Sequence, residues 1–341
     1  MVCTEVPQTL ERALDPDWLG QALGRPVNAV ERVELIKTVA TKVRFAATFA
    51  NSAETGRYCL KGLLDVDPLT ARGGPTMVRE ADFYGKVAAR VDVRVPHCVT
   101  SVIDREAQQA VVIMRDLIAD GARFCTALEP FSADQAARSL DQIAHLHAGR
   151  GLLDGMAWIN GRIGELAKAQ YVSLGQLQEM LDGPRGEHLP AATRSAERLV
   201  AAMGVLAERD AARPHFLIHG DCHAGNIFRT AERPGLIDWQ LLQRGSWALD
   251  VAYHIVAVLP VDLAEREERK LLGHYLTTMR GLGFAMPDEE EAWLQFRESL
   301  IYGYYLWAIT RRVDPPIINL FVNRLGAAVT RHESHRLLGI A

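Results

Sequence analysis

The alternation of hydrophobic and polar positions in the first part of the chain predicts a short helix followed by a β-sheet. Asp15 and Pro16 mark the start of the helix, because Asp caps a first turn well and Pro suits the first helical position. The helix is expected to cover residues 16–24. Alternating or continuous apolar residues, many of them β-branched, then predict two strands at residues 31–36 and 43–50.

Two more apolar segments predict further strands, with a helix between them. Residues 58–62 form the third strand, and the unbroken apolar run at residues 110–114 predicts a buried strand. The segment 77–89 has the spacing of a helix. The loop at residues 65–75 is rich in Gly and Pro and is predicted to be mobile.

Helical patterns dominate the rest of the chain. Ser132 and Gln135 form a capping box, which predicts a helix that continues to about His147. Other helical segments are predicted at residues 155–213 with a break at Gly183-Pro184, at 251–258 with Asp250 as the N-cap, and at 288–311.

Composition restricts the class of protein. The chain has 341 residues, 48% hydrophobic and 23% charged, as expected of a globular protein with two lobes or domains. A formal net charge of −4 gives no electrostatic basis for binding nucleic acid. No apolar run reaches the length of a membrane helix, and the first residues lack the pattern of a signal peptide. The five scattered cysteines form no CxxC motif, which predicts reduced thiols in a cytoplasmic protein.

Three side chains within residues 219–250 predict chemistry on phosphate groups. Asp221 is followed five residues later by Asn226, and Asp238 lies twelve residues further on, inside an apolar run. Carboxylate and amide oxygens suit Mg²⁺ held together with substrate phosphates, so Asn226 and Asp238 are the candidate metal ligands. An Asp beside such a site can accept the proton of a substrate hydroxyl, which makes Asp221 the candidate catalytic base.

A hairpin is expected to bring the two candidate metal ligands together. Residues 226–228 and 236–237 have the composition of short strands, and the Pro234-Gly235 pair between them is a turn signal. A hairpin with this turn places Asn226 and Asp238 close to each other.

The complete pattern resembles a known group of enzymes. His219-Gly220-Asp221 with Asn226, followed by Asp238-Trp239-Gln240, is similar to the motifs of small-molecule kinases with the protein-kinase-like fold, namely aminoglycoside phosphotransferases, choline kinases and ecdysteroid-kinase-like proteins. The resemblance implies a bilobal α+β fold, with a small antiparallel-sheet lobe at residues 1–116 and a mainly helical lobe at residues 117–341. It also implies an ATP-dependent O-phosphotransferase that uses Mg²⁺ and acts on a small-molecule alcohol.

The resemblance assigns roles to residues of the first lobe. Lys61, whose place in an apolar strand calls for a partner or a ligand, is implied to reach the α- and β-phosphates. Glu80 is implied to orient Lys61, and Asp82 is the alternative acid. Thr41 and Lys42, with Thr38, are candidates for phosphate contacts.

Two further roles follow from the same resemblance. The backbone of Arg115 to Leu117 is implied to hydrogen-bond the adenine edge. An Asp at the position of Asp250 is implied to brace the catalytic loop from behind, besides capping its helix.

Other interpretations stay open at this point. The turn at residues 37–42 lacks the glycines of the resembled family, which favours a nucleotide-binding protein with little transfer activity. His215, His219, Asp221 and His223 are dense enough for a zinc site, which would indicate a hydrolase. The aromatic residues Tyr302, Tyr304, Tyr305 and Trp307 are expected to be core residues, or alternatively to contact a cationic substrate.

Overall fold

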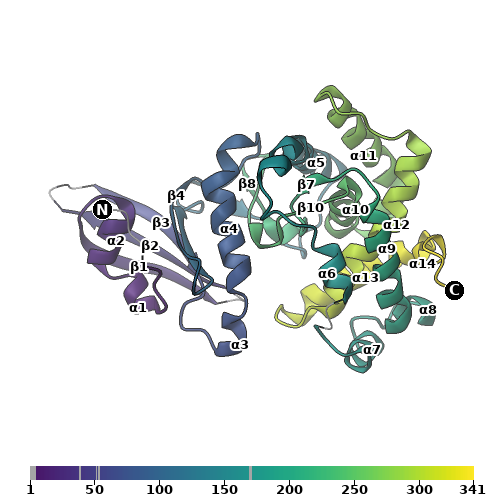
Figure 1. Ribbon diagram of the computed structural model, residues 1–341, viewed down its shortest axis with the longest axis horizontal. Helices are drawn as coiled ribbons and strands as arrows, with labels where there is room; N and C mark the ends of the chain where they lie inside the picture. Colours follow the sequence, from purple (N-terminus) through teal and green to yellow (C-terminus); the bar gives the residue numbers. More distant parts are fainter. Residues whose placement is uncertain (1–4, 38–39, 51, 53, 169–170) are drawn as a thin grey trace. The chain divides into compact units, whose positions relative to one another are not determined.

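The computed structural model describes residues 5–37, 40–50, 52, 54–168 and 171–341. The chain divides into two compact units, and each is built from more than one segment (Figure 1). The first unit comprises Met1–Arg90, Arg94–Arg123 and Leu236–Leu241, and the second comprises the remainder. Compared with the predicted boundary at residue 116, the first unit runs on to Arg123 and also includes a short segment from much later in the chain.

The first unit contains a five-stranded antiparallel sheet in the order β1-β2-β3-β5-β4. Its strands are β1 Val27–Lys37, β2 Thr41–Phe49, β3 Thr55–Gly62, β4 Cys98–Asp104 and β5 Gln109–Arg115. The four predicted strands are therefore confirmed, and β4 is an additional edge strand.

The helices of the first unit confirm the predicted cap at Asp15 and correct the predicted loop at residues 65–75. They are α1 Leu10–Ala13, α2 Pro16–Leu23, α3 Pro68–Ala71, α4 Gly74–Lys86 and the 3-10 turn η1 Ala88–Arg90. The side chain of Asp15 caps α2 by accepting a hydrogen bond from the Trp18 N–H, and Gly24 ends it with a left-handed φ of 68°. The predicted loop at residues 65–75 is wrong in part, because α3 and the first turn of α4 occupy much of it.

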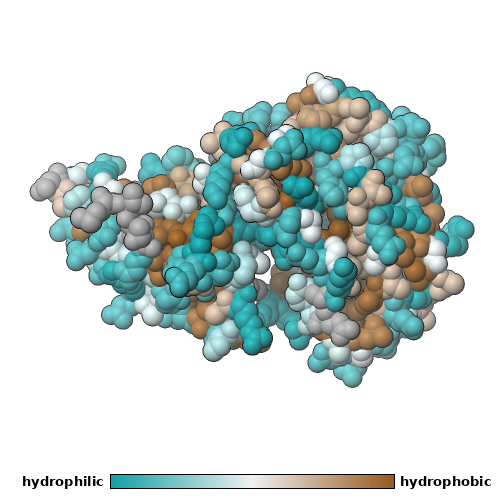
Figure 2. Space-filling model, viewed as in Figure 1, coloured by the Kyte–Doolittle hydropathy of each residue, from teal (hydrophilic) through white to brown (hydrophobic). Residues whose placement is uncertain are grey.

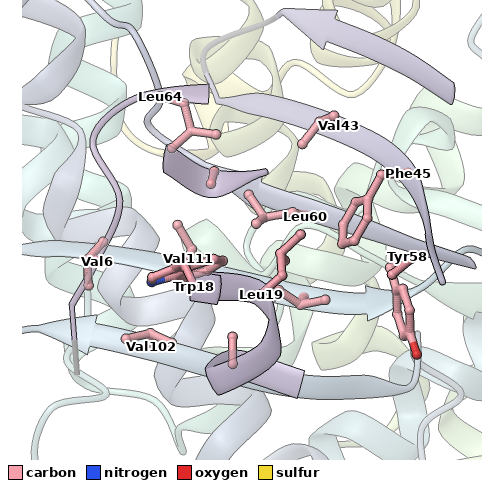
Figure 3. Close-up of a cluster of buried hydrophobic side chains, with 14 of the residues drawn as sticks. Val6, Trp18, Leu19, Val43, Phe45, Tyr58, Leu60, Leu64, Val102 and Val111 are labelled. Carbon is pink, nitrogen blue, oxygen red and sulfur yellow. The ribbon is translucent and has the colours of Figure 1, made fainter. Parts of the chain in front are cut away.

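The two faces of this sheet differ in polarity, because successive side chains along a strand point to opposite faces. One face packs against α2 and forms a hydrophobic core in which Trp18 and Leu19 belong to one buried cluster with Val43, Phe45 and Leu60 (Figure 3). The intervening residues Lys42 and Lys61 are cross-strand partners on the opposite face. That face therefore presents charged side chains beside α4.

The second unit is mainly helical. Its longer helices are α5 Ala133–Ala148, α7 Leu174–Asp182, α9 Ala196–Ala211, α10 Trp247–Val258, α11 Val261–Gly281, α12 Glu289–Ile309 and α13 Pro315–Arg331. Its short helical segments are η2 Gly149–Gly155, α6 Ile163–Lys168, α8 Ala191–Arg194, η3 Ala224–Asn226 and α14 Ser334–Leu337. The 3-10 turn η4 Trp239–Leu241 belongs to the first unit. The predicted capping box is formed at the start of α5, and Asp288 caps α12.

Two small sheets accompany these helices. They have the orders β10-β7 and β6-β8-β9. Their strands are β6 Arg123–Phe124, β7 Phe216–Ile218, β8 Ile227–Thr230, β9 Arg233–Leu236 and β10 Gln243–Gly245. Because β7 leads directly into residue 219 and β8 begins at residue 227, these strands hold both ends of the segment that carries the candidate catalytic base.

The surface is largely polar. In Figure 2 hydrophilic side chains predominate, interspersed with smaller hydrophobic areas. Across the part of the chain that the structure describes, no helix is both long enough and apolar enough to span a bilayer.

Candidate active site

Lys61 lies in a cluster of charged groups within the first unit. Its Nζ atom is 2.6 Å from Oε2 of Glu80 on α4 and 3.0 Å from Oδ1 of Asp238. The side chains of Lys61 and Glu80 are 4% and 1% exposed, whereas that of Asp238 is 24% exposed. The lysine is thus held between a buried carboxylate and a carboxylate that solvent can reach.

These contacts determine the charge of the cluster. Burial alone would lower the pKa of the Lys61 ammonium group, but the carboxylates of Asp238 and Glu80 raise it above its ordinary value. Burial raises the pKa of Glu80, and the charge of Lys61 opposes that effect. Lys61 therefore stays protonated at neutral pH.

The segment that carries Asp238 is anchored on α4. The ring of Trp239 stacks on Phe83, with centroids 3.7 Å apart and planes 12° apart. The amide of Gln240 lies 2.9 Å from the sulfur of Met77. Asp238 itself has a φ of 66°, a left-handed conformation that is costly for a residue with a side chain. The packing of the two residues that follow Asp238 stabilises this conformation, in which the carboxylate reaches Lys61.

Thr41 and Lys42, the other predicted phosphate contacts, differ in their surroundings. The buried Thr41 hydroxyl donates a hydrogen bond of 3.0 Å to the Leu64 carbonyl. Lys42 is half-buried opposite Lys61, and it makes no ion pair with any residue that the structure describes. Burial, and then the charge of Lys61, lower the pKa of Lys42. Lys42 therefore has no carboxylate in ion-pair contact among the described residues, while Thr38 lies outside them.

The predicted adenine-binding segment is fixed by an ion pair. Nε of Arg44 donates to both carboxylate oxygens of Asp116 at 3.1 Å, and Asp116 Oδ1 also accepts from the Ile118 N–H at 3.1 Å. The Arg115 N–H donates to the His97 carbonyl, and the Leu117 carbonyl accepts from the Ala122 N–H. The Arg115 N–H and the Leu117 carbonyl thus already form hydrogen bonds within the protein.

Asp250 holds the candidate catalytic loop in the second unit. One of its carboxylate oxygens accepts the His219 N–H at 2.7 Å, and the other accepts the Gly220 N–H at 2.8 Å. Gly220 has a left-handed φ of 82°, which favours glycine at this position. The predicted N-cap role of Asp250 is wrong, because Ser246 caps α10 and Asp250 lies in its first turn. Asp250 does hold the backbone of this loop, as the resemblance implied.

Asp250 remains a buried anion. Burial alone would raise the pKa of its carboxyl, but the hydrogen bond and charge of His147 and the Gly220 N–H hold it below the ordinary value. His147, at 3.2 Å from Asp250, also lies 2.7 Å from the Tyr275 hydroxyl. His147 is therefore a structural residue.

Asp221 is oriented by its neighbours within the second unit. Oδ1 accepts a hydrogen bond of 3.0 Å from the Tyr253 hydroxyl, and Oδ2 accepts one of 3.0 Å from the side-chain amide of Asn226. Nε2 of His223 lies 3.5 Å from the same Oδ2. Trp307 donates to the Tyr253 hydroxyl at 2.5 Å. Burial, and then the charge of Asp221, raise the pKa of Tyr253 well above its ordinary value, so this hydroxyl stays protonated and donates.

The hairpin after Asn226 forms with a different turn from the one predicted. Strand β8 ends at Thr230 and strand β9 begins at Arg233. Ala231, in the turn between them, has a left-handed φ of 51°. The prediction of a turn at Pro234-Gly235 is wrong, because both residues lie inside β9. Pro is tolerated there because β9 is an edge strand, where its missing N–H costs no ladder bond.

The structure groups the predicted site residues into two sets. Lys61, Glu80 and Asp238 meet in the first unit, and Asp221 meets Asn226 in the second. The amide nitrogen of Asn226 is bonded to both Oδ2 and the carbonyl of Asp221, which leaves the amide oxygen as the atom available to a cation.

The alternative zinc site is not formed in the described part of the chain. No three His, Cys, Asp or Glu side chains among those residues are arranged to hold a metal ion. Nδ1 of His219 accepts the Asp221 N–H, and Nδ1 of His223 accepts the Gly225 N–H. The ring of His215 instead contacts the carbonyl of Asp210.

Tyr302, Tyr304, Tyr305 and Trp307 are buried, as predicted, but the hydrogen bonds that aromatic residues make around this loop were not predicted. The buried Tyr302 donates to the Gly220 carbonyl at 2.7 Å, and Tyr253 and Trp307 form the chain of hydrogen bonds to Asp221. Tyr253 had a detectable signal, because it lies three residues after Asp250 and thus on the same face of α10. The contacts of Tyr302 and Trp307 had no local signal, because α12 reaches the loop only through tertiary packing.

Comparison with known proteins agrees with this geometry. Residues 45–286 match the sequence model of the phosphotransferase enzyme family. Among curated proteins, no sequence match was found.

Several solved structures have a similar fold. An ethanolamine kinase from Plasmodium vivax is 14% identical, covers 89% of this chain and 82% of its own, and has a TM-score of 0.51. A choline kinase from Cryptosporidium parvum is 11% identical, with coverages of 96% and 93% and a TM-score of 0.50. A thermostable mutant of an aminoglycoside phosphotransferase is 14% identical, with coverages of 93% and 99% and a TM-score of 0.50. The predicted fold class is thereby confirmed.

Proposed function

This chain belongs to the phosphotransferase enzyme family, and from that premise we propose that it transfers the γ-phosphoryl group of ATP to a hydroxyl group of a small molecule. The predicted enzyme class, a phosphotransferase with an alcohol acceptor, is confirmed at the level of the family. ATP as the donor and Mg²⁺ as the cofactor belong to the proposal.

The observation that carries the proposal is the ion-pair cluster of Lys61. A buried lysine fixed by Glu80 presents a permanent positive charge at a defined position, which is what binding the α- and β-phosphates of a nucleotide requires. Lys42 adds a second cation on the same face of the sheet. Catalysis of phosphoryl transfer depends mainly on positioning and electrostatic stabilisation, and both lysines supply these.

The residues present fit a magnesium ion. Asp238 offers a partly exposed carboxylate and Asn226 offers its amide oxygen, and hard oxygen donors of this kind suit Mg²⁺. When bound, the ion would neutralise negative charge on the phosphates. We assign Asn226 and Asp238 as the residues that hold it.

Asp221 serves as the base in this proposal. Its carboxylate accepts the proton of the acceptor hydroxyl as the oxygen attacks phosphorus. Tyr253 and Asn226 each bond a different carboxylate oxygen and fix its orientation, while Asp250 fixes the backbone on the N-terminal side. The acceptor is expected to be a small alcohol such as an amino alcohol or an amino sugar.

The test separates binding from transfer. Purified protein is titrated with Mg·ATP by calorimetry and then assayed for phosphoryl transfer to a panel of amino alcohols, aminoglycosides and macrolides. We expect Asp221→Asn to bind Mg·ATP normally and to transfer about 10²–10⁴-fold more slowly, because Asn keeps the shape but cannot accept a proton. Wild-type protein that binds no Mg·ATP would overturn the proposal.

Two other outcomes identify the alternatives. Tight Mg·ATP binding with no turnover on any acceptor of the panel would favour a nucleotide-binding protein with little transfer activity. Stoichiometric zinc in the purified protein, lost in Asp221→Asn, would favour a hydrolase.

A further inference from the structure

A second site of concentrated charge lies in the second unit, away from the residues assigned above. It is a cavity of about 270 Å³ whose lining includes Arg150, Arg213, His215 and Arg244. We call these four residues the arginine pocket. His215 immediately precedes β7, and the catalytic loop follows the other end of that strand. A strand of three residues spans about 10 Å, so the pocket and the loop lie at opposite ends of it.

Two of the arginines carry charges that no carboxylate neutralises. Arg244 donates to two neutral carbonyl oxygens, those of Ile159 at 2.7 Å and Leu153 at 3.1 Å. The guanidinium of Arg150 lies over the ring of Phe216, 4.8 Å from its centroid. Neither arginine forms an ion pair with a residue that the structure describes, although both are half-buried.

Arg213 is only partly compensated. It pairs with Glu298, but Arg209 pairs with the same carboxylate, so two guanidinium groups share one negative charge. In addition, Nη1 of Arg213 is buried and has no hydrogen-bond partner among the described residues. Buried donors are normally satisfied, and one that is not points to a water molecule or an ion in the site.

His215 contributes positive charge when protonated, and two acids, Asp210 and Asp154, oppose the positive character of the pocket. The Asp210 carboxylate, which accepts a hydrogen bond from the His215 ring, raises the pKa of His215 and so increases its protonated fraction near neutral pH. Asp154 also lines the cavity, but it is exposed to solvent and its charge is screened there. Glu298 offsets part of the charge of Arg213 and Asp210 offsets that of His215, so the positive excess of the pocket comes mainly from Arg150 and Arg244.

We propose that the arginine pocket binds a phosphate group, either as inorganic phosphate or as the phosphate of a small monoester. Guanidinium groups match the geometry of phosphate oxygens, and two arginines without a carboxylate partner, Arg150 and Arg244, favour a dianion over a carboxylate. The volume is below the roughly 300–1,000 Å³ typical of pockets for larger ligands, so it suits a single phosphate group and not a nucleotide. This inference does not depend on the proposed transfer reaction.

The experiment compares two arginines of equal charge. Inorganic phosphate is titrated into wild-type protein, Arg150→Gln and the control Arg266→Gln by calorimetry. Arg266 pairs with Asp262 on the exposed face of α11, so both variants lose one positive charge. We expect Arg150→Gln to weaken phosphate binding by about tenfold, because a charge-assisted contact is lost, and Arg266→Gln to leave it unchanged.

The nucleotide site must be excluded as the place of binding. The titrations are therefore repeated in the Lys61→Met background, where binding to the arginine pocket should persist and binding to the proposed nucleotide site should not. Phenyl phosphate in place of inorganic phosphate shows whether a monoester is accepted. Absence of phosphate binding at tens of millimolar, loss of all binding in Lys61→Met, or equal affinity in Arg150→Gln and wild type would each overturn the inference.

Discussion

The carboxylate of Asp250 accepts the backbone N–H of Gly220 at 2.8 Å across a separation of 30 residues in the chain. The same side chain accepts the His219 N–H, so a single buried anion fixes two consecutive peptide groups before the candidate base. Its ionised state is required, because both oxygens must act as acceptors.

Asp250→Asn is predicted to destabilise the protein and slow transfer together. The amide has one acceptor oxygen and one NH₂ group, so one backbone N–H loses its partner inside the protein. We expect a loss of about 1–3 kcal/mol in the free energy of unfolding, measured by denaturant titration. Asp262→Asn, which removes an exposed carboxylate, should change the stability by less than about 1 kcal/mol. Equal stability of wild type and Asp250→Asn would contradict the role of this anion.

Lys61 and Glu80 are predicted to be energetically coupled. Lys61→Met leaves the Glu80 carboxylate buried without its counter-charge, and breaking a buried pair in this way costs about 3–5 kcal/mol. Glu80→Gln leaves Lys61 with Asp238 and should cost less. The double variant should recover stability but not Mg·ATP affinity, because the cation itself is gone. A double-mutant cycle on unfolding free energy and on nucleotide affinity measures both effects, and additive effects on stability would argue against the pair.

Asp238→Ala is predicted to remove productive Mg·ATP binding while the fold persists. The partly exposed Asp238 carboxylate is the assigned oxygen donor of the first unit, and Trp239 still anchors the segment on Phe83. Calorimetric titration with Mg·ATP measures the loss, and the exposed Asp17→Ala serves as the control. Unchanged affinity in a folded Asp238→Ala protein would exclude the metal assignment.

Lys42 is predicted to make nucleotide affinity sensitive to alkaline pH. Burial and the charge of Lys61 lower the pKa of Lys42 from its ordinary value of 10.5, so it loses its proton at a lower pH than an exposed lysine does. Only the protonated form attracts phosphate, and affinity should therefore fall as the pH rises from 8 toward 10.5. We expect a loss of about tenfold, as for one charge-assisted contact.

Lys42→Arg supplies the matched control for this effect. The guanidinium stays charged over the whole range, and Lys61, whose pKa is raised, also keeps its proton. The affinity of Lys42→Arg for Mg·ATP should consequently stay flat between pH 8 and 10. A parallel fall in wild type and variant would mean that another group is responsible.

Local sequence signals predicted much of the fold because the corresponding interactions are local. Asp15, Ser132 and Asp288 each cap the helix that they were expected to start, since a cap bonds residues only two or three positions away. The hydrogen bond between the side chains of Asn226 and Asp221 was not predicted, because Asp238 was the expected neighbour of Asn226.

The errors arose where tertiary contacts override local preference. Pro234-Gly235 has the composition of a turn, yet it lies in an edge strand because the hairpin turns earlier, at Ala231. Asp250 has the composition of a cap, yet α10 continues through the apolar residues before it and begins after Ser246. The hydrogen bonds of Tyr302 and Trp307 join segments more than 50 residues apart, and no local pattern encodes them.

The return of Leu236–Leu241 to the first unit limits how this protein can be divided. A fragment that ends at Arg123 would contain Lys61 and Glu80 but would lack one of the two carboxylates that surround the lysine. It would also expose the face of Phe83 that Trp239 covers. An independently expressed first unit therefore has to carry residues 236–241, either joined through a linker or added as a separate peptide.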